Sequence, residues 1–349
     1  MEISDLEFFV VKIECTGQPL PVCPLLVRLA CESGEEGWGE ARTGWRASEL
    51  AARRDALLPV LTGRSIFDVE ELLALEVLST PQLRCALEMA SWDLIGRVLG
   101  QPLCHLFGGR YRRRIPLAAR LPGSLPDRVA HLAREMAEQG FHTQTVPSCG
   151  RVEGDAQTLA AVRASACDRL QLQLDAGAGY DPASALELCT AVEPQGLQLL
   201  LDPLAGSELY PMAALRRQTG VPLAVGRAIG SPADVLAAVR CGAAPFVVID
   251  PGRVGGLVPA RKCAAVADAA GIQALLGSGP CLGIATAAML HLAAATPALA
   301  SPNQCAYHQL QEDVLAEPLE IVDGMIAVPQ APGLGVDVDR GKVEQYQVT

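Results

Sequence analysis

Short apolar segments alternate with amphipathic segments of helical period through the last two thirds of the chain. Each apolar segment has the length of a buried strand. The apolar segments recur about every 25 to 30 residues, which is typical of successive βα units. Seven such units favour a closed parallel barrel, and an open doubly wound sheet is the alternative on this pattern alone. The predicted strands cover residues 115–118, 143–146, 170–174, 197–201, 223–225, 246–249 and 272–276.

The first hundred residues have a different pattern. Residues 6–13 and 25–30 are rich in β-forming side chains, and a Glu- and Gly-containing turn follows at residues 35–40. Helical periodicity then continues to about residue 100. The pattern predicts an α/β protein in which a small α+β lobe precedes the barrel.

Composition narrows the possible partners. A chain of 349 residues with 50% hydrophobic content can bury the core of a barrel with an accessory lobe. The net charge of −11 argues against nucleic acid or an anionic membrane surface as a partner. No apolar run reaches the roughly 18 residues that span a bilayer, and the N-terminus lacks the basic segment of a signal peptide. We therefore expect a cytoplasmic protein with a small-molecule partner, and we also expect a homo-oligomer.

Cysteine and lysine usage restricts the chemistry further. The 12 cysteines include no C-x-x-C pair, so we expect small buried side chains rather than a disulfide or metal framework. The lysines number three, Lys12, Lys262 and Lys342, among 28 basic residues. Because arginine stays protonated, a lysine general base could lie at these three positions alone.

Candidate site residues follow the predicted strands, because the active sites of parallel barrels lie where the strands end. No glycine-rich phosphate loop occurs there, so a nucleotide cofactor is not expected. Cys281 also follows a predicted strand, and without a histidine partner we expect it to be inert rather than nucleophilic. The polar and charged candidates are Arg120, Thr145, Asp175, Asp202, Arg227 and Asp250.

The segment RCALEMASWDL at residues 84–94, followed by QPL at 101–103 and LFGG at 106–109, resembles the mandelate racemase and muconate cycloisomerase group of the enolase superfamily. The resemblance implies a modified TIM barrel at residues 113–318, an α+β capping domain at 1–112, and a C-terminal segment at 319–349 that returns to the cap. Five further landmarks occur in that group's order: GWGEA at 37–41, GF at 140–141, DAGAGY at 175–180, RVGGL at 253–257 and PGLGV at 332–336.

The resemblance also implies Mg²⁺-dependent proton abstraction next to a carboxylate, which needs three carboxylate ligands and an acid/base pair. Of the ligand positions, Asp175 keeps its carboxylate, whereas Leu201 and Gly226 replace the other two. The usual Lys-x-Lys base becomes Thr145 and Pro147. Asp250 stands where cycloisomerases have a lysine and racemases an aspartate.

These replacements leave two interpretations of the charged residues. Arg227 could hold a substrate carboxylate in place of the metal, or it could fill the abandoned site through an ion pair. In either case we expect its guanidinium to project into the barrel mouth and to pair with Asp175, Asp202 or Asp250. Trp45 and Arg46, which follow the GWGEA turn, are either lid contacts to the substrate or plain surface.

We therefore expect a diverged family member without a metal cofactor, because the Mg²⁺ ligands of the family are not retained. It would bind a small carboxylate or carry out metal-free chemistry, with Asp250, Arg227 and Asp175 as candidate catalytic residues. Thr145, Asp202, Arg120, Trp45 and Arg46 are candidate substrate contacts. One alternative is an active racemase, cycloisomerase or o-succinylbenzoate-synthase-like enzyme, hence an isomerase or lyase. The other is a catalytically silent structural partner.

Overall fold

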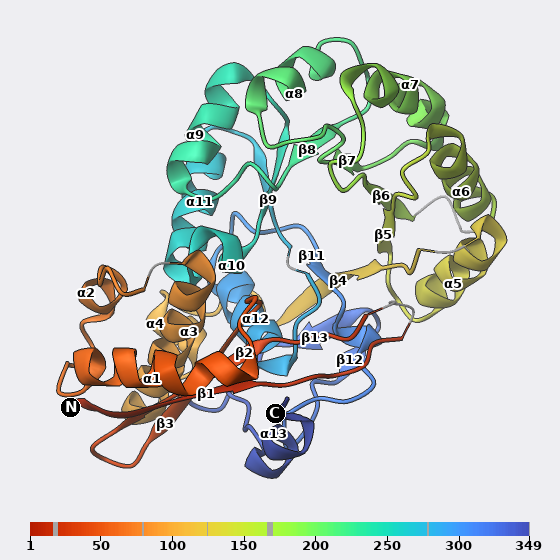
Figure 1. Cartoon of the computed structure of the whole chain (residues 1–349). Coiled ribbons are helices and arrows are strands. Elements are labelled where there is room, and N and C mark those ends of the chain that lie inside the picture. The colour runs from red at the N-terminus through yellow and green to blue at the C-terminus, as the bar shows by residue number, and fades with distance from the viewer. Residues whose placement is uncertain (17–19, 79, 124, 166–169, 278, 349) are drawn as a thin grey trace.

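The N-terminal part of the protein is a three-stranded sheet with helices against it (Figure 1). The computed structural model describes residues 1–16, 20–78, 80–123, 125–165, 170–277 and 279–348. The antiparallel order is β1 (Ile3–Val10), β2 (Leu25–Cys31) and β3 (Glu36–Ala41). Helices α1 (Ala47–Leu61), α2 (Val69–Leu73) and α3 (Pro81–Leu99) follow. This agrees with the α+β lobe that the sequence predicts.

Strand β3 lies directly on helix α3, and two glycines make this approach possible. A Cβ atom on Gly39 would lie 1.9 Å from the carbonyl oxygen of Ala86, and one on Gly37 would lie 2.2 Å from that of Ala90. No side chain fits at such distances. The GWGEA landmark therefore has a packing role in the cap.

In the part of the chain that the structure describes, eight parallel strands form the barrel, so the prediction of a barrel is confirmed and the alternative of an open sheet is wrong. The last strand pairs with the first, and a parallel bridge between Gly277 and Gln304 joins it to the seventh. The sequence pattern missed this last strand, Asn303–Cys305, because it is short and partly polar. The strands in order are β4 (Arg114–Arg120), β5 (Thr143–Pro147), β6 (Gln171–Asp175), β7 (Leu199–Leu201), β8 (Leu223–Val225), β9 (Phe246–Ile249), β10 (Gln273–Leu276) and β11 (Asn303–Cys305).

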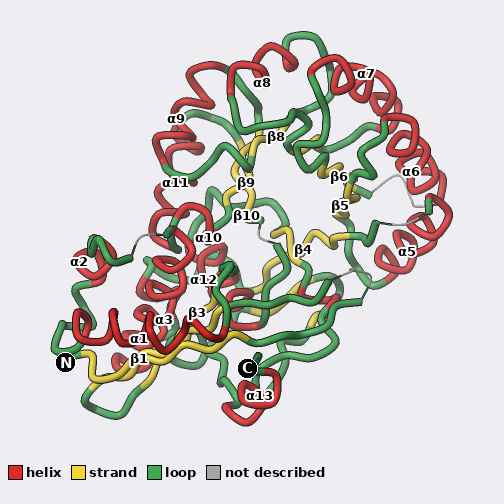
Figure 2. The backbone as a smooth tube through the Cα atoms, viewed as in Figure 1, coloured by secondary structure: helices red, strands yellow, loops and turns green. Residues whose placement is uncertain are grey.

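Helices surround the barrel on its outside, as Figure 2 shows. Local signals set their ends: the Ser231 hydroxyl accepts from the backbone N–H of Asp234 at the start of α9, and Gly242 ends that helix with φ of 68°. Among the described residues, no helix is long and apolar enough to cross a membrane. The longer outer helices are α5 (Pro126–Glu138), α6 (Val152–Ser165), α7 (Pro182–Val192), α8 (Leu209–Arg216), α9 (Pro232–Cys241), α11 (Leu257–Ala269) and α12 (Gly283–Ala295).

Two buried carboxylates of the cap bind the N-termini of barrel helices. Glu40 of β3 accepts from the backbone N–H groups of Leu282 and Ala285, at 2.7 and 2.9 Å, where α12 begins. Glu88 of α3 accepts from Leu257 and Val258 at the start of α11. Anionic side chains are favourable at this end of a helix, because its free N–H groups point outward. These bonds hold the cap on the barrel.

The C-terminal segment contacts both parts of the molecule. Strand β13 (Met325–Ala327) pairs with β12 (Ile321–Val322) and with β4 of the barrel. After helix α13 (Arg340–Tyr346), the backbone N–H of Val348 donates to the carbonyl of Val10 in the cap at 2.8 Å. The predicted boundaries at residues 112 and 318 stay predictions, although these contacts agree with a segment that returns to the cap.

Candidate functional site

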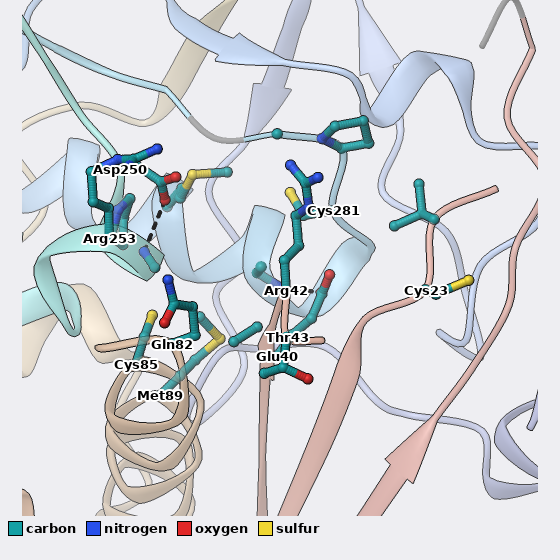
Figure 3. Close-up of a pocket in the computed structure, with 18 of the residues that line it drawn as sticks. Cys23, Glu40, Arg42, Thr43, Gln82, Cys85, Met89, Asp250, Arg253 and Cys281 are labelled. Atoms are coloured by element: carbon teal, nitrogen blue, oxygen red, sulfur yellow. Dashed lines mark hydrogen bonds between the residues drawn. The ribbon is translucent and has the colours of Figure 1, made fainter. Parts of the chain in front are cut away.

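A cavity of about 720 Å³ lies between the cap and the ends of the last barrel strands. The cap contributes residues 20–23, the end of β3 and one face of α3, and the barrel contributes the loops after β9 and β10. Figure 3 shows its principal side chains, which are Cys23, Glu40, Arg42, Thr43, Gln82, Cys85, Met89, Asp250, Arg253 and Cys281.

Asp250 is the predicted site residue that lines this cavity. It follows β9 and caps the short helix α10 (Pro251–Val254), where its Oδ1 accepts from the backbone N–H of Gly252 at 2.9 Å. Burial raises the pKa of Asp250, while this hydrogen bond and the charges of Arg253 and Arg42 oppose the shift. The cavity therefore contains a carboxyl group that holds a proton more tightly than an ordinary surface aspartate.

Two arginines that sequence reasoning did not select also line the cavity. Arg42 comes directly after β3, and Arg253 lies in α10, three positions after Asp250. Neither guanidinium forms an ion pair or hydrogen bond with a residue that the structure describes. The sequence does contain a signal that could have pointed to both arginines, because Arg42 follows the GWGEA landmark and Arg253 begins the RVGGL landmark.

Sulfur-containing side chains form much of the remaining wall. Cys85 and Met89 reach the cavity from α3, and Cys281 and Met289 reach it from the β10–α12 side. Burial, together with the charges of Glu88, Asp250 and Glu40, raises the pKa of Cys85, so this residue stays a thiol. Cys281 is 4% exposed, and its Sγ lies 3.6 Å from the Thr286 hydroxyl. This part of the wall is apolar, as expected for inert cysteines.

Three predicted site residues do not line the cavity and form hydrogen bonds with other protein groups instead: Arg120, Asp175 and Thr145. Arg120 donates to Asp175 Oδ2 at 2.8 Å, and Asp175 Oδ1 accepts from the backbone N–H of Gly177. The buried Thr145 hydroxyl donates to Gln173 Oε1 at 2.9 Å inside the barrel. The structure thus brings Arg120 and Asp175 together, but as partners of each other.

The prediction that the Arg227 side chain pairs with a mouth carboxylate is wrong. Arg227 is exposed and forms no ion pair with any residue in the described part of the chain. Its backbone N–H instead donates to Asp202 Oδ2 at 3.0 Å, and that of Gly226 donates to Oδ1 at 2.9 Å. Asp202 adopts the left-handed region with φ of 44°, which turns its carboxylate onto these groups. Asp202 therefore supports the loop after β8.

Trp45 and Arg46 lie at the start of α1 and do not reach the cavity. The Trp45 ring packs edge-on against Phe8, and the guanidinium of Arg53 lies 4.1 Å from its centroid. Arg46 is exposed and precedes α1 as its N-cap. Arg46 therefore agrees with the surface interpretation, whereas Trp45 packs within the cap, and neither residue lines the cavity. The cap residues that face the cavity come just before them, at Arg42 and Thr43.

The residues at the expected Mg²⁺ position do not fit that ion. Leu201 is 7% exposed and belongs to an apolar cluster inside the barrel that includes Ala224 and Val248. Asp175 is paired with Arg120, and both oxygens of Asp202 accept backbone hydrogen bonds. Mg²⁺ requires an octahedral shell rich in oxygen ligands. Within the described residues, no group of three metal-binding side chains comes together.

Comparison with known proteins agrees with this architecture. Residues 22–108 match the family Mandelate racemase / muconate lactonizing enzyme, N-terminal domain, and residues 128–342 match Enolase C-terminal domain-like. Muconate cycloisomerase 1 of Rhodococcus opacus is 28% identical, with 95% of this chain and 91% of that protein covered.

Solved structures give the same result. An isomerase from Streptomyces coelicolor A3(2) superimposes with a TM-score of 0.88 at 29% identity, over 99% of this chain and 96% of that one. N-succinyl Arg/Lys racemase from Bacillus cereus has a TM-score of 0.92 at 21% identity, over 100% and 99% of the two chains, and shares the fold. This chain belongs to the mandelate racemase and muconate lactonizing enzyme group of the enolase superfamily.

Proposed function

We propose that this protein is a diverged member of its family that binds a small carboxylate in the cavity between cap and barrel, without Mg²⁺. The observation that carries the proposal is the pair of guanidinium groups, Arg42 and Arg253, that line the cavity and form no ion pair with a described residue. A planar guanidinium matches the two oxygens of a carboxylate, and such charge-assisted hydrogen bonds are among the stronger ones in proteins.

Isothermal titration with a panel of small carboxylates tests the proposal, with and without Mg²⁺. We expect saturable binding to the unmodified protein, the same affinity in the presence of Mg²⁺, and a loss of roughly tenfold or more in Arg42→Ala. Arg227→Ala is the matched control, because this arginine is exposed and lies outside the cavity. Absence of binding across the panel, or binding that requires Mg²⁺, would refute the proposal.

A second candidate function is metal-free proton exchange, which the position of Asp250 in the cavity favours. Its carboxylate would take a proton from the carbon next to the ligand carboxylate, and the C–H electron pair would move onto the carboxylate to form an enediolate. A guanidinium would stabilise the added negative charge, and the proton would return from Asp250. The racemase and cycloisomerase relatives support chemistry of this class.

Nuclear magnetic resonance in D₂O separates the two candidates. Exchange of the α-hydrogen of a bound acid for deuterium would demonstrate proton abstraction, and Asp250→Asn should abolish it while binding persists. Binding without exchange would leave carboxylate binding as the function. The homo-oligomer and the cytoplasmic location stay predictions; light scattering after size-exclusion chromatography would measure the former.

A further inference from the structure

Helix α12 begins at the wall of the cavity, and two carboxylates from separate parts of the chain bind its first turn. Glu40 of β3 accepts from the backbone N–H groups of Leu282 and Ala285 at 2.7 and 2.9 Å. Asp313, which lies in the segment after β11, accepts from the backbone N–H of Gly283 at 3.2 Å. One helix N-terminus therefore binds two carboxylates at once.

Of these two carboxylates, Asp313 has more contacts that favour its ionised form. The Tyr307 hydroxyl donates to its Oδ2 at 2.7 Å, and the backbone N–H of Val314 donates to its Oδ1 at 2.8 Å. Burial raises the pKa of Asp313, but these bonds and the charge of Lys342 oppose the shift. Glu40 accepts from the two α12 N–H groups and forms no ion pair with a residue that the structure describes. Glu40 is therefore the member of the pair that takes up a proton more readily.

Glu40 should change its charge near neutral pH. Burial and, to a smaller extent, the charge of Asp313 raise the pKa of Glu40 to about 7, against the two hydrogen bonds from α12. Two carboxylates that share one buried site favour the state in which one of them carries a proton. Arginine side chains keep their charge in this pH range. The other titratable or charged side chains that line the same cavity are Cys23, Arg42, Cys85, Asp250, Arg253 and Cys281.

Glu40 lies beside the arginine that the proposed ligand would bind. Glu40 and Arg42 are two positions apart, so their side chains leave the extended cap segment on the same side, and both line the cavity (Figure 3). A Cβ atom on Gly279 would lie 1.6 Å from Arg42 Nη1 and 2.7 Å from Cζ, so the guanidinium lies against the backbone of the loop after β10. The fold thus keeps the Arg42 charge close to Glu40 and the start of α12.

A carboxylate bound at Arg42 would add a negative charge next to Glu40. In a site that is partly closed to water, this charge disfavours the ionised form of Glu40. The linkage is reciprocal: a ligand that makes Glu40 take up a proton binds more tightly when Glu40 is already protonated.

We propose that Glu40 regulates the cavity as a proton-linked switch: it takes up a proton when a carboxylate binds at Arg42, so the affinity for small carboxylates falls as the pH rises through neutrality. This inference rests on the proposed carboxylate-binding function. In it, Asp313 supplies the fixed negative charge that favours protonated Glu40.

Isothermal titration with formate, acetate and benzoate, in buffers of different ionisation enthalpy, counts the protons that are taken up with the ligand. We expect about half a proton per bound acid at pH 7.5, and an affinity that falls by about fivefold from pH 6 to pH 8. Glu40→Gln, which cannot ionise, should bind without proton uptake and without this pH dependence. The exposed Glu138→Gln is the control and should behave like the unmodified protein.

The outcomes separate the switch from the function on which it rests. Equal affinity at pH 6 and pH 8 without proton uptake would overturn the inference and leave carboxylate binding standing, whereas no binding of any of the three acids would overturn both. Proton uptake that persists in Glu40→Gln and disappears in Asp250→Asn would also overturn the inference, because the proton would then go to Asp250.

A second variant tests the pair of carboxylates. Asp313→Asn should move the pH dependence of binding to higher pH-independent affinity only below neutrality, that is, to a lower pH range, because the charge that favours protonated Glu40 is removed. An unchanged pH range in this variant would refute the role of Asp313. Unfolding temperatures of all variants exclude loss of folding as the cause.

Discussion

The two sides of the barrel mouth carry similar charged residues, but on one side these residues bind other groups of the protein and on the other side two arginines bind none that the structure describes. On the β4–β8 side, Arg120 donates to Asp175 and backbone N–H groups donate to Asp202, so the protein satisfies its own polar groups. On the side facing the cap, the guanidinium groups of Arg42 and Arg253 have no ion-pair partner among the described residues. A charged side chain that lines a cavity without a protein partner is therefore a better candidate for a ligand contact than one that the fold already pairs.

The largest effect on stability should come from replacing Asp155, a buried carboxylate on the side where the polar groups bind one another. It accepts from the hydroxyls of Ser148 and Tyr180 and from the backbone N–H of Cys149. Asp155→Ala leaves these donors without their acceptor and should lower the free energy of unfolding by about 4 kcal/mol. Chemical denaturation measures the change, with the exposed Asp268→Ala as control. A loss similar to that of the control would contradict the structural role.

Glu40 lines the cavity, but its carboxyl group accepts hydrogen bonds from the backbone at the start of α12. Its ionisation should make the free energy of unfolding depend on pH. Burial raises the pKa of Glu40 from 4.5 to about 7, against the hydrogen bonds from Leu282 and Ala285. Its stabilising contribution is present below about pH 4.5 and is lost as the pH rises through 7, by up to about 3 kcal/mol.

Unfolding measured from pH 4.5 to 8 checks this dependence. Glu40→Gln should be less sensitive to pH than the unmodified protein over that range, and the exposed Glu138→Gln should retain the full dependence. If Glu40→Gln and the unmodified protein follow parallel curves, the Glu40 carboxylate is ionised throughout and the helix N-terminus dominates its environment.

Removing one arginine from each side of the barrel mouth, and measuring both stability and affinity, sharpens the comparison. Arg120→Ala should cost about 1 kcal/mol of stability, because its ion pair with Asp175 is partly exposed, and should leave carboxylate affinity unchanged. Arg42→Ala should do the reverse, with little loss of stability and a large loss of affinity. Thermal unfolding and calorimetry on both variants give the four values. Loss of binding in Arg120→Ala would place the ligand deeper in the barrel mouth than we propose.

The smallest expected effect is that of Mg²⁺. Leu201 and Gly226 supply no ligand oxygen from their side chains, and Asp175 is neutralised by Arg120. Millimolar Mg²⁺ should therefore produce no binding heat and no shift of the unfolding temperature. A saturable shift that Asp175→Asn removes would contradict this expectation and would revive the alternative of an ordinary metal-dependent enzyme.

Prediction from the sequence succeeded best where the signal is local and repeated. The alternation of apolar strands and helices predicted seven of the eight barrel strands, and the missing one has three residues, of which Asn303 and Gln304 are polar. The site was predicted less completely. The sequence points to Asp250, which lines the cavity. It does not single out Arg42 and Arg253, because their places beside the GWGEA and RVGGL landmarks do not show which arginines lack a protein partner.

The sequence by itself determined the family, the barrel and the limits of its chemistry, because periodicity, landmark order and the count of three lysines do not depend on how distant side chains meet. Tertiary structure alone decided which charges pair. Arg120 and Asp175 are 55 positions apart, and they meet because β4, β5 and β6 are neighbours in the sheet. Arg42 and Gly279 meet because a cap strand is bound to a barrel loop. Ion pairs depend on distances of a few ångströms between separate elements, and packing alone sets those distances.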